Sequence, residues 1–146
     1  MEFTEQITTT ASRADAWSAV TAVTTWPDWT PSMRLVEPLD SPEIVVGHRF
    51  RVTQPGLARM VWTVTEVREG ESFDWVAKSP GLHITGYHRV ADAPGGGTLI
   101  TIGILQTGAL AGLVGRLLRA KTRRYLGLEA AGLKAASVAV GADSSA

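Results

Sequence analysis

The sequence predicts a single α+β domain in which a long C-terminal helix closes a curved antiparallel sheet over an internal, mostly apolar pocket. Three observations support this fold class. The chain has the length of one domain, 146 residues, of which 45% are hydrophobic and 19% charged. Short alternating segments separated by glycine and proline fill its middle, and a long segment of helical periodicity follows them. This composition excludes a disordered protein.

The N-terminal segment predicts one strand and one helix. Residues 3–10 are rich in threonine and partly alternate, which is typical of a strand. Ser12 is a predicted N-cap, and apolar residues at helical spacing predict a helix over residues 12–24. The prolines of residues 26–31 forbid a long helix, so we expect a turn or one short helical piece there.

Six further strands are predicted in the middle of the chain. Glycine- or proline-containing turns separate them, and the turn before the last strand reads Asp-Ala-Pro-Gly-Gly-Gly. Consecutive strands with short connections predict an antiparallel meander. The predicted strands are residues 33–38, 48–54, 58–68, 72–77, 82–91 and 98–106.

The period of the apolar residues changes to that of a helix at Leu110, and we expect this helix to run to about Val138. Its glycines weaken it, and a break before Gly115 is an alternative to one continuous helix. Residues 141–146 are predicted to be a flexible tail after a single domain of residues 1–140. The predicted apolar stripe comprises Leu110, Val114, Leu117, Leu118, Tyr125, Leu128, Ala131 and Ala135.

Charge is unevenly distributed although the formal net charge is zero. Residues 1–107 carry 8 basic and 12 acidic side chains, whereas residues 108–140 carry six basic side chains against Glu129. Such a basic helix either contacts phosphates or an acidic membrane surface, or is a solubilising outer face. The net-acidic strand region disfavours nucleic-acid binding across the sheet.

Several classes of protein are disfavoured by what the sequence lacks. Without cysteine, neither a disulfide nor a thiolate metal site can form. No signal peptide and no run of eighteen apolar residues is visible, so we expect a cytoplasmic protein without a transmembrane segment. Neither a nucleophile elbow, a metal-ligand spacing nor a phosphate loop is present, and we expect no metal and no organic cofactor.

Three segments in order carry a resemblance to a known family. Trp26–Trp29 is similar to the W-P-x-W segment of the START-like (SRPBCC) superfamily, Val46–Phe50 to its vGxrf segment, and Gly96–Thr101 to its GGT-x-v-T hairpin. The polyketide cyclase/dehydrase-like group is the branch that the chain resembles most. The resemblance spans nearly the whole chain and implies a helix-grip fold, as in START and Bet v 1-like proteins. A curved seven-stranded antiparallel sheet then surrounds the C-terminal helix and a cavity. Known members bind lipids, polyketides or hormones, and some catalyse cyclisation or aromatisation.

Alternation along the strands predicts which side chains face the pocket. In the last strand Ile100, Ile102 and Ile104 share one face, and pairing across the glycine-rich turn puts the even-numbered residues from 84 to 90 on it too. The alternative is that these residues fill a closed core. The predicted ligand-binding residues are Phe50, Val52, Trp62, Val64, Trp75, Ile84, His88, Ile100, Ile102, Ile104, Val114, Leu117, Lys121 and Tyr125.

Three of these residues are polar candidates. An inward His88 would bind a ligand carbonyl or act as an acid/base, or else be a buried histidine with a protein partner. Lys121 lies within the predicted apolar stripe and would bind a carboxylate or enolate, or else extend to water at the pocket mouth. Tyr125 lies beside the stripe and offers a hydroxyl group.

The sequence therefore predicts a protein, monomeric or homodimeric, that binds, transports or sequesters a small hydrophobic or amphipathic molecule. We expect binding rather than catalysis because no catalytic set is visible. One alternative is a polyketide cyclase/dehydrase-like enzyme with His88 as acid/base and Lys121 or Tyr125 stabilising an oxyanion. The other is an interaction module that uses the basic C-terminal helix.

Overall fold

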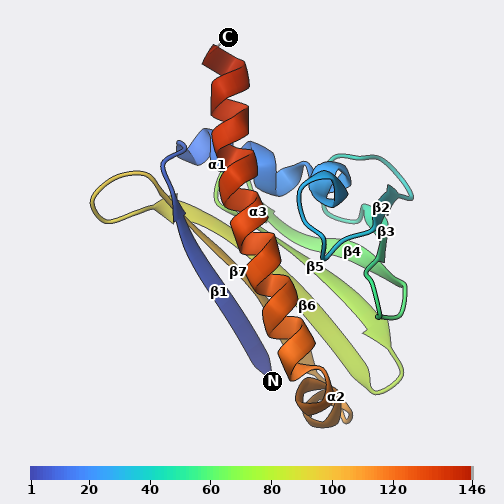
Figure 1. Cartoon of the computed structure of the whole chain (residues 1–146). Coiled ribbons are helices and arrows are strands. Elements are labelled where there is room, and N and C mark those ends of the chain that lie inside the picture. The colour runs from blue at the N-terminus through green and yellow to red at the C-terminus, as the bar shows by residue number, and fades with distance from the viewer. Residues whose placement is uncertain (146) are drawn as a thin grey trace.

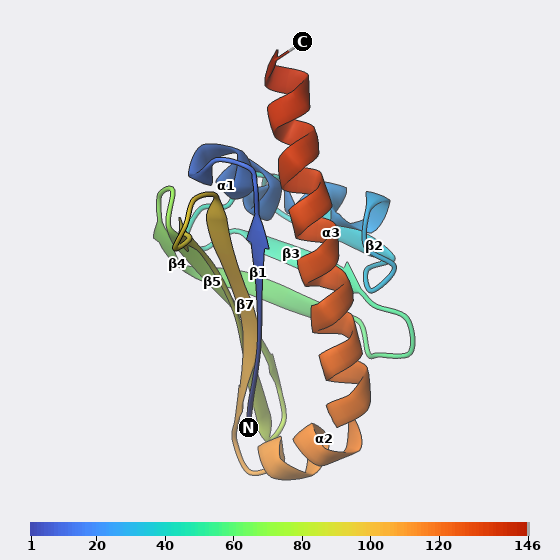
Figure 2. The same ribbon diagram turned by 60° about the vertical axis from the view of Figure 1, so that its left-hand side comes forward.

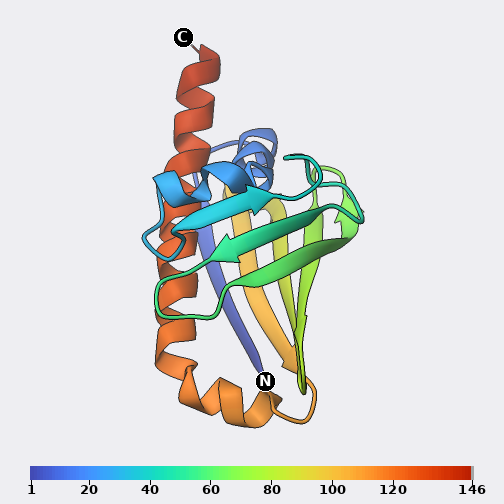
Figure 3. The same ribbon diagram turned by 90° about the vertical axis from the view of Figure 1, so that its right-hand side faces the viewer.

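The computed structural model describes residues 1–145 and shows a seven-stranded sheet with helical segments on one face (Figure 1). The long C-terminal helix crosses that face of the curved sheet, as Figures 2 and 3 show from the sides, so the predicted helix-grip fold is confirmed. The elements are β1 (Glu2–Thr9), α1 (Arg13–Thr21), the 3-10 helix η1 (Val23–Asp28), β2 (Leu35–Pro38), β3 (Arg49–Thr53), β4 (Met60–Arg68), β5 (Ser72–Ser79), β6 (Leu82–Asp92), β7 (Thr98–Thr107), α2 (Ala111–Leu117) and α3 (Arg119–Ser145).

The strands form one antiparallel sheet in the order β1-β7-β6-β5-β4-β3-β2. The meander from β2 to β7 is the one that the short turns predict, and β1 pairs with β7 at its end. Across the glycine-rich turn, Gly86 pairs with Ile104 and His88 with Ile102, which confirms the predicted register. His88 and Ile102 are both buried, and this face of the sheet lies toward α3.

The N-terminal helices begin and end where local chemistry places them. The Ser12 side chain accepts a hydrogen bond of 3.1 Å from the backbone N–H of Asp15, which confirms the predicted N-cap of α1. The proline-containing segment forms η1, a short helical piece as expected. Trp26 of η1 is fully buried against Trp75 of the sheet, with ring centroids 5.5 Å apart.

The C-terminal helical region is broken at Leu118. The sequence predicts one continuous helix or, as the alternative, a break before Gly115. Leu118 caps α2, and α3 starts at Arg119. At its other end α3 passes the predicted end near Val138 and includes residues 141–145. The flexibility of this end stays a prediction, and Ala146 lies outside the described residues.

The break also corrects the predicted apolar stripe. Ala131 and Ala135 are exposed, and Leu117 is 74% exposed. The prediction treats residues 110–138 as one continuous helix. The turn at Leu118 rotates the residues of α3 relative to those of α2, so the predicted apolar side of the helix does not continue into α3. The buried face of α3 is instead formed by Leu126, Glu129, Ala130, Gly132, Leu133 and Ser137, at the spacing of one helix side.

The C-terminal half of α3 is fixed closely to the rest of the fold. The hydroxyl groups of Thr9 on β1 and Ser137 share a buried hydrogen bond of 3.0 Å. Gly132 lies against the indole of Trp29, and a Cβ atom there would overlap the ring. The space between helix and sheet therefore lies under α2 and the N-terminal half of α3.

Candidate functional site

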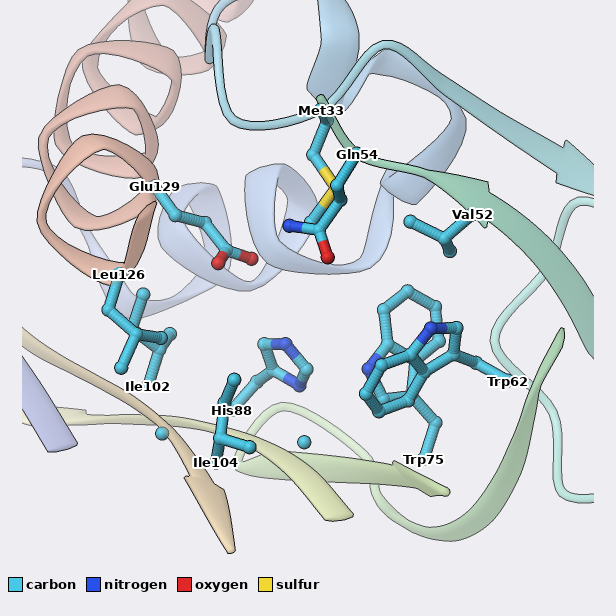
Figure 4. Close-up of a pocket in the computed structure, with 12 residues that line it drawn as sticks. Met33, Val52, Gln54, Trp62, Trp75, His88, Ile102, Ile104, Leu126 and Glu129 are labelled. Carbon is cyan, nitrogen blue, oxygen red and sulfur yellow. The ribbon is translucent and has the colours of Figure 1, made fainter. Parts of the chain in front are cut away.

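Two adjoining hollows lie between the sheet and its helical cover, and Val52, Gln54, Trp62 and Ile104 line both of them. The outer hollow has a volume of about 470 Å³ and lies between α2, the β3–β4 loop and the β5–β6 hairpin. The inner hollow, of about 50 Å³, lies deeper, between the sheet and α3 (Figure 4). Together they form a cavity with an outer part beside α2 and a smaller inner end that is lined mostly by buried residues.

The outer hollow is mainly apolar. Ile84 and Ile104 line it from the sheet, and Val114 and Leu118 line it from the helical side. Gln106 is a polar exception: its side-chain oxygen is buried and has no hydrogen-bond partner within residues 1–145.

His88 projects from β6 into the inner hollow as a neutral hydrogen-bond acceptor. Its Nδ1 lies 3.2 Å from the backbone oxygen of Phe73, and its ring stacks on the Phe73 ring with centroids 4.1 Å apart. A carbonyl oxygen only accepts, so Nδ1 carries the proton and Nε2 is left with a lone pair. Burial lowers the pKa of His88 to about 3, so the ring is uncharged at neutral pH.

Glu129 enters the inner hollow from α3 and is the residue that sequence reasoning missed. It is 7% exposed, and among the described residues it has no hydrogen-bond or ion-pair partner. Burial raises the pKa of its carboxyl group to about 8, so the group carries a proton at neutral pH and can both donate and accept. The spacing of Leu126, Ala130 and Leu133 was the available signal, because it places Glu129 on the same helix side.

Gln54 and two tryptophans complete the polar lining of the inner hollow. Gln54 donates from Nε2 to the backbone oxygen of Ser32 at 3.2 Å, which leaves its side-chain oxygen free to accept. Figure 4 shows the Gln54 amide, the Glu129 carboxyl group and the His88 ring directed into the same space. The indole N–H groups of Trp62 and Trp75 have no acceptor in the described part of the chain.

Gly86 makes room for Trp75 beside the hollow. The two residues are register partners on β6 and β5. A Cβ atom on Gly86 would lie 2.7 Å from Nε1 of Trp75, closer than any normal contact. The Trp75 ring is further surrounded by the rings of Phe50, Phe73 and Trp62, with centroids between 5.5 and 5.9 Å away. This aromatic cluster forms a rigid wall for the cavity.

The structure brings together only part of the predicted ligand-binding set. Phe50, Val64 and Ile100 lie in the closed core, as the alternative interpretation expects, and Leu117 is largely exposed because the break at Leu118 turns it outward. The predicted residues that line the hollows are Val52, Trp62, Trp75, Ile84, His88, Ile102, Ile104 and Val114.

Lys121 and Tyr125 lie at the mouth and outside the lining of both hollows. Lys121 Nζ donates to the backbone oxygen of Gly56 at 3.3 Å, and the Tyr125 hydroxyl donates to that of Pro55. Both side chains thus tie the start of α3 to the β3–β4 loop. The alternative placement of Lys121 at the mouth is the observed one.

Residues 1–145 contain neither a cluster of metal ligands nor a membrane-spanning helix. No group of three or more His, Asp or Glu side chains is placed to share a metal ion. No helix combines the length and the apolar character that crossing a bilayer requires.

Comparison with known proteins gives a family and a fold. The family model described as "Polyketide cyclase / dehydrase and lipid transport" matches residues 1–138. No curated protein matches the sequence significantly.

Several solved structures share the fold at low sequence identity. The ZhuI aromatase/cyclase from Streptomyces sp. R1128 superposes with a TM-score of 0.74 at 15% identity, covering 94% of this chain and 93% of that one. Ara h 8.0201 gives a TM-score of 0.66 at 14% identity, with coverages of 95% and 98%. A hypothetical protein from Helicobacter pylori gives 0.75 at 13% identity, with coverages of 93% and 86%. At such identities the likeness shows the fold alone.

Proposed function

The chain belongs to the polyketide cyclase/dehydrase and lipid transport family, and from that premise we propose that it binds a small amphipathic molecule between the sheet and α3. The apolar body of the ligand occupies the outer hollow, and an uncharged polar group enters the inner one. The observation that carries this proposal is Glu129, a buried carboxyl group that has no partner among the described residues and lies at the inner end of a mainly apolar cavity. Such a group destabilises a fold, and a ligand gives it a partner.

The volumes of the two hollows support this division of the ligand. The outer volume of about 470 Å³ lies within the range of sites for drug-sized molecules. The inner volume of about 50 Å³ is roughly a tenth of the outer one. It therefore suits one hydroxyl or carbonyl group and excludes a second ring.

The lining of the inner hollow supports an uncharged polar group. Nε2 of His88 accepts a hydrogen bond, protonated Glu129 donates or accepts one, and the Trp75 indole donates one. No lysine or arginine lines this hollow. A carboxylate on the ligand would be buried there without a counter-ion, which is costly. We therefore propose a hydroxyl- or carbonyl-bearing molecule, such as a phenol or an enol.

An enzyme of the cyclase/dehydrase kind is the second candidate, and Glu129 favours it. A pKa of about 8 lies near the operating pH, as general acid–base catalysis requires. His88, whose pKa lies near 3, carries no proton to donate from Nε2 at neutral pH. Glu129 therefore replaces His88 as the proposed acid/base of this alternative.

Calorimetric titration with three probes of one shape tests the binding proposal. The probes are 2-naphthol, naphthalene and 2-naphthoate, which carry a hydroxyl group, no polar group and a carboxylate. We expect 2-naphthol to bind at least about fivefold more tightly than the other two, since one buried hydrogen bond contributes on the order of 1 kcal/mol. Equal affinities would contradict the polar inner end, and absence of binding by all three would contradict the cavity.

Two variants locate the binding. Glu129→Leu removes both hydrogen-bonding atoms and is expected to abolish the preference for 2-naphthol, whereas exposed Glu66→Gln leaves it unchanged. For the enzyme alternative, turnover of a substrate that is lost in Glu129→Gln and retained in His88→Gln would assign the proton transfer to Glu129.

A further inference from the structure

The outer side of α2 is apolar and uncovered. Leu110, Leu113 and Leu117 are 45%, 58% and 74% exposed, and their spacing places them on one side of the helix. The opposite side of α2 is also apolar, since Ala111 is buried and Val114 lines the outer hollow. Of these two apolar sides of α2, only the inner one is covered by the rest of the fold. The leucines therefore indicate a surface that meets another apolar phase.

Cations that have no acidic partner in the described part of the chain lie beside these leucines. Residues 93–128 contain five Lys and Arg residues and no Asp or Glu. Arg116, Arg119, Arg123 and Arg124 are exposed, and none of the salt bridges within residues 1–145 involves them. Leucines and arginines on one short helical segment form the pattern of an interfacial helix.

The same end of the molecule is basic around the cavity mouth, whereas the opposite end is acidic. Arg59 and Lys78 are exposed side chains that line the outer hollow from the β3–β4 loop and the end of β5. Glu69 and Asp92 lie at the other end of the strands, where Glu69 accepts a hydrogen bond from Trp17 of α1 and Asp92 pairs with Arg13. Figure 1 shows α2 and α1 at opposite ends of the sheet. A protein without net charge is thus polarised along its sheet.

We propose that α2 and the start of α3, residues 110–124, dock on an anionic lipid surface. The three leucines enter the headgroup region, the arginines contact lipid phosphates, and the cavity mouth opens toward the membrane. Charge complementarity selects this occupant. A second copy of the chain would bring two basic ends together, and a neutral bilayer would leave the arginines without partners. This docking is independent of which molecule the cavity binds.

Vesicle flotation tests the docking surface. The probes are vesicles of phosphatidylcholine alone and of phosphatidylcholine mixed with phosphatidylglycerol. We expect the protein to float with the anionic vesicles only and to be released as salt is raised. Failure to bind anionic vesicles at low salt, or equal binding to both kinds, would overturn the proposal.

Matched variants distinguish binding through this surface from nonspecific adsorption to vesicles. Leu113→Ser with Leu117→Ser, and Arg116→Glu with Arg119→Glu, are each expected to weaken vesicle binding at least about tenfold. The control is Leu35→Ser with Arg34→Glu, which changes the exposed leucine that begins β2 and the exposed arginine just before it, away from α2. Vesicle binding by the α2 variants at the level of this control would contradict the assignment of residues 110–124 as the docking surface.

Two further measurements distinguish lipid docking from ligand binding and from self-association. Titration of each variant with 2-naphthol is expected to give the wild-type affinity, which shows that the cavity is intact and that docking fails separately from ligand binding. Analytical ultracentrifugation reports self-association. A wild-type dimer that dissociates in the leucine variant would identify the face as a self-interface and would overturn lipid docking.

Discussion

Glu129 and His88 face the same small hollow, and burial moves their pKa values in opposite directions. Removal from water disfavours the charged form of each group, so it raises the pKa of the acid and lowers that of the imidazole. Both groups are therefore uncharged across the neutral range. Their atoms are available for hydrogen bonds and carry no formal charge to attract a counter-ion.

Substitution of Glu129 by glutamine tests the raised pKa. The pKa of Glu129 rises from 4.5 to about 8 on folding, so its contribution to stability is present below about pH 4.5 and is lost as the pH rises through 8. The pKa of His88 falls from 6.5 to about 3, so its contribution is present above 6.5 and is lost as the pH falls toward 3. Between about pH 6.5 and 8, Glu129 is the one of these two groups whose titration changes the free energy of unfolding with pH.

We expect Glu129→Gln to remove this pH dependence. Relative to wild type, its free energy of unfolding is then higher at about pH 9 than at about pH 5, by roughly 1–3 kcal/mol. Chemical denaturation at the two pH values measures the difference, with exposed Glu66→Gln as the control. A substitution effect that is the same at both pH values would show that Glu129 is ionised in the folded protein.

Gly86 offers a second test at a single residue. In Gly86→Ala the new Cβ would lie 2.7 Å from Trp75 Nε1 and 2.9 Å from its Cδ1, so the indole must shift within a rigid aromatic cluster. We expect a loss of about 1–3 kcal/mol in the free energy of unfolding, with a change in tryptophan fluorescence. Gly127→Ala is the control, because a Cβ there meets nothing within 4 Å and a helix prefers alanine by about 1 kcal/mol. Equal effects of the two changes would refute the close packing at Gly86.

At the scale of elements, the start of α3 holds the loop that borders the cavity mouth. The Tyr125 hydroxyl and Lys121 Nζ each donate to a backbone oxygen of the β3–β4 loop. These bonds link a helix to a loop that carries lining residues of the outer hollow, such as Leu57. His88 and Glu129 of the inner hollow lie on other elements and take no part in these bonds.

Tyr125→Phe removes one of these bonds. We expect faster amide hydrogen exchange in residues 54–59 and a loss of about 1 kcal/mol in stability. Tyr87→Phe is the matched control. It also removes a hydrogen-bonded hydroxyl group, which contacts the side chains of Thr4 and Glu2 on the other face of the sheet. Exchange in residues 54–59 that is unchanged in Tyr125→Phe, or accelerated equally in Tyr87→Phe, would contradict the role of the bond to Pro55.

The elements also explain what could be predicted from the sequence. Alternation has a period of two, so it gives the face of each β6 and β7 residue, and the glycine-rich turn gives their register. A helix face needs a phase as well as a period, and the non-helical turn at Leu118 resets that phase. For this reason Lys121 was expected in the pocket and Glu129 was not, although both stand in the same helix.

At the scale of the molecule, the cavity divides into an apolar outer part and a neutral polar end. The outer part opens beside α2, where the exposed leucines and the basic side chains lie, and the inner part ends against η1 and the core. The sequence predicts the sheet and its helix because their apolar patterns are local. It does not predict the volume between them, because that volume depends on how the aromatic rings and α3 pack.

The structure of the protein with 2-naphthol bound tests the central claim most directly. The account predicts that the rings lie in the outer hollow and that the hydroxyl oxygen is within hydrogen-bonding distance of Glu129 or of Nε2 of His88. A ligand whose hydroxyl group points to the mouth, with the inner hollow closed by side chains, would contradict it.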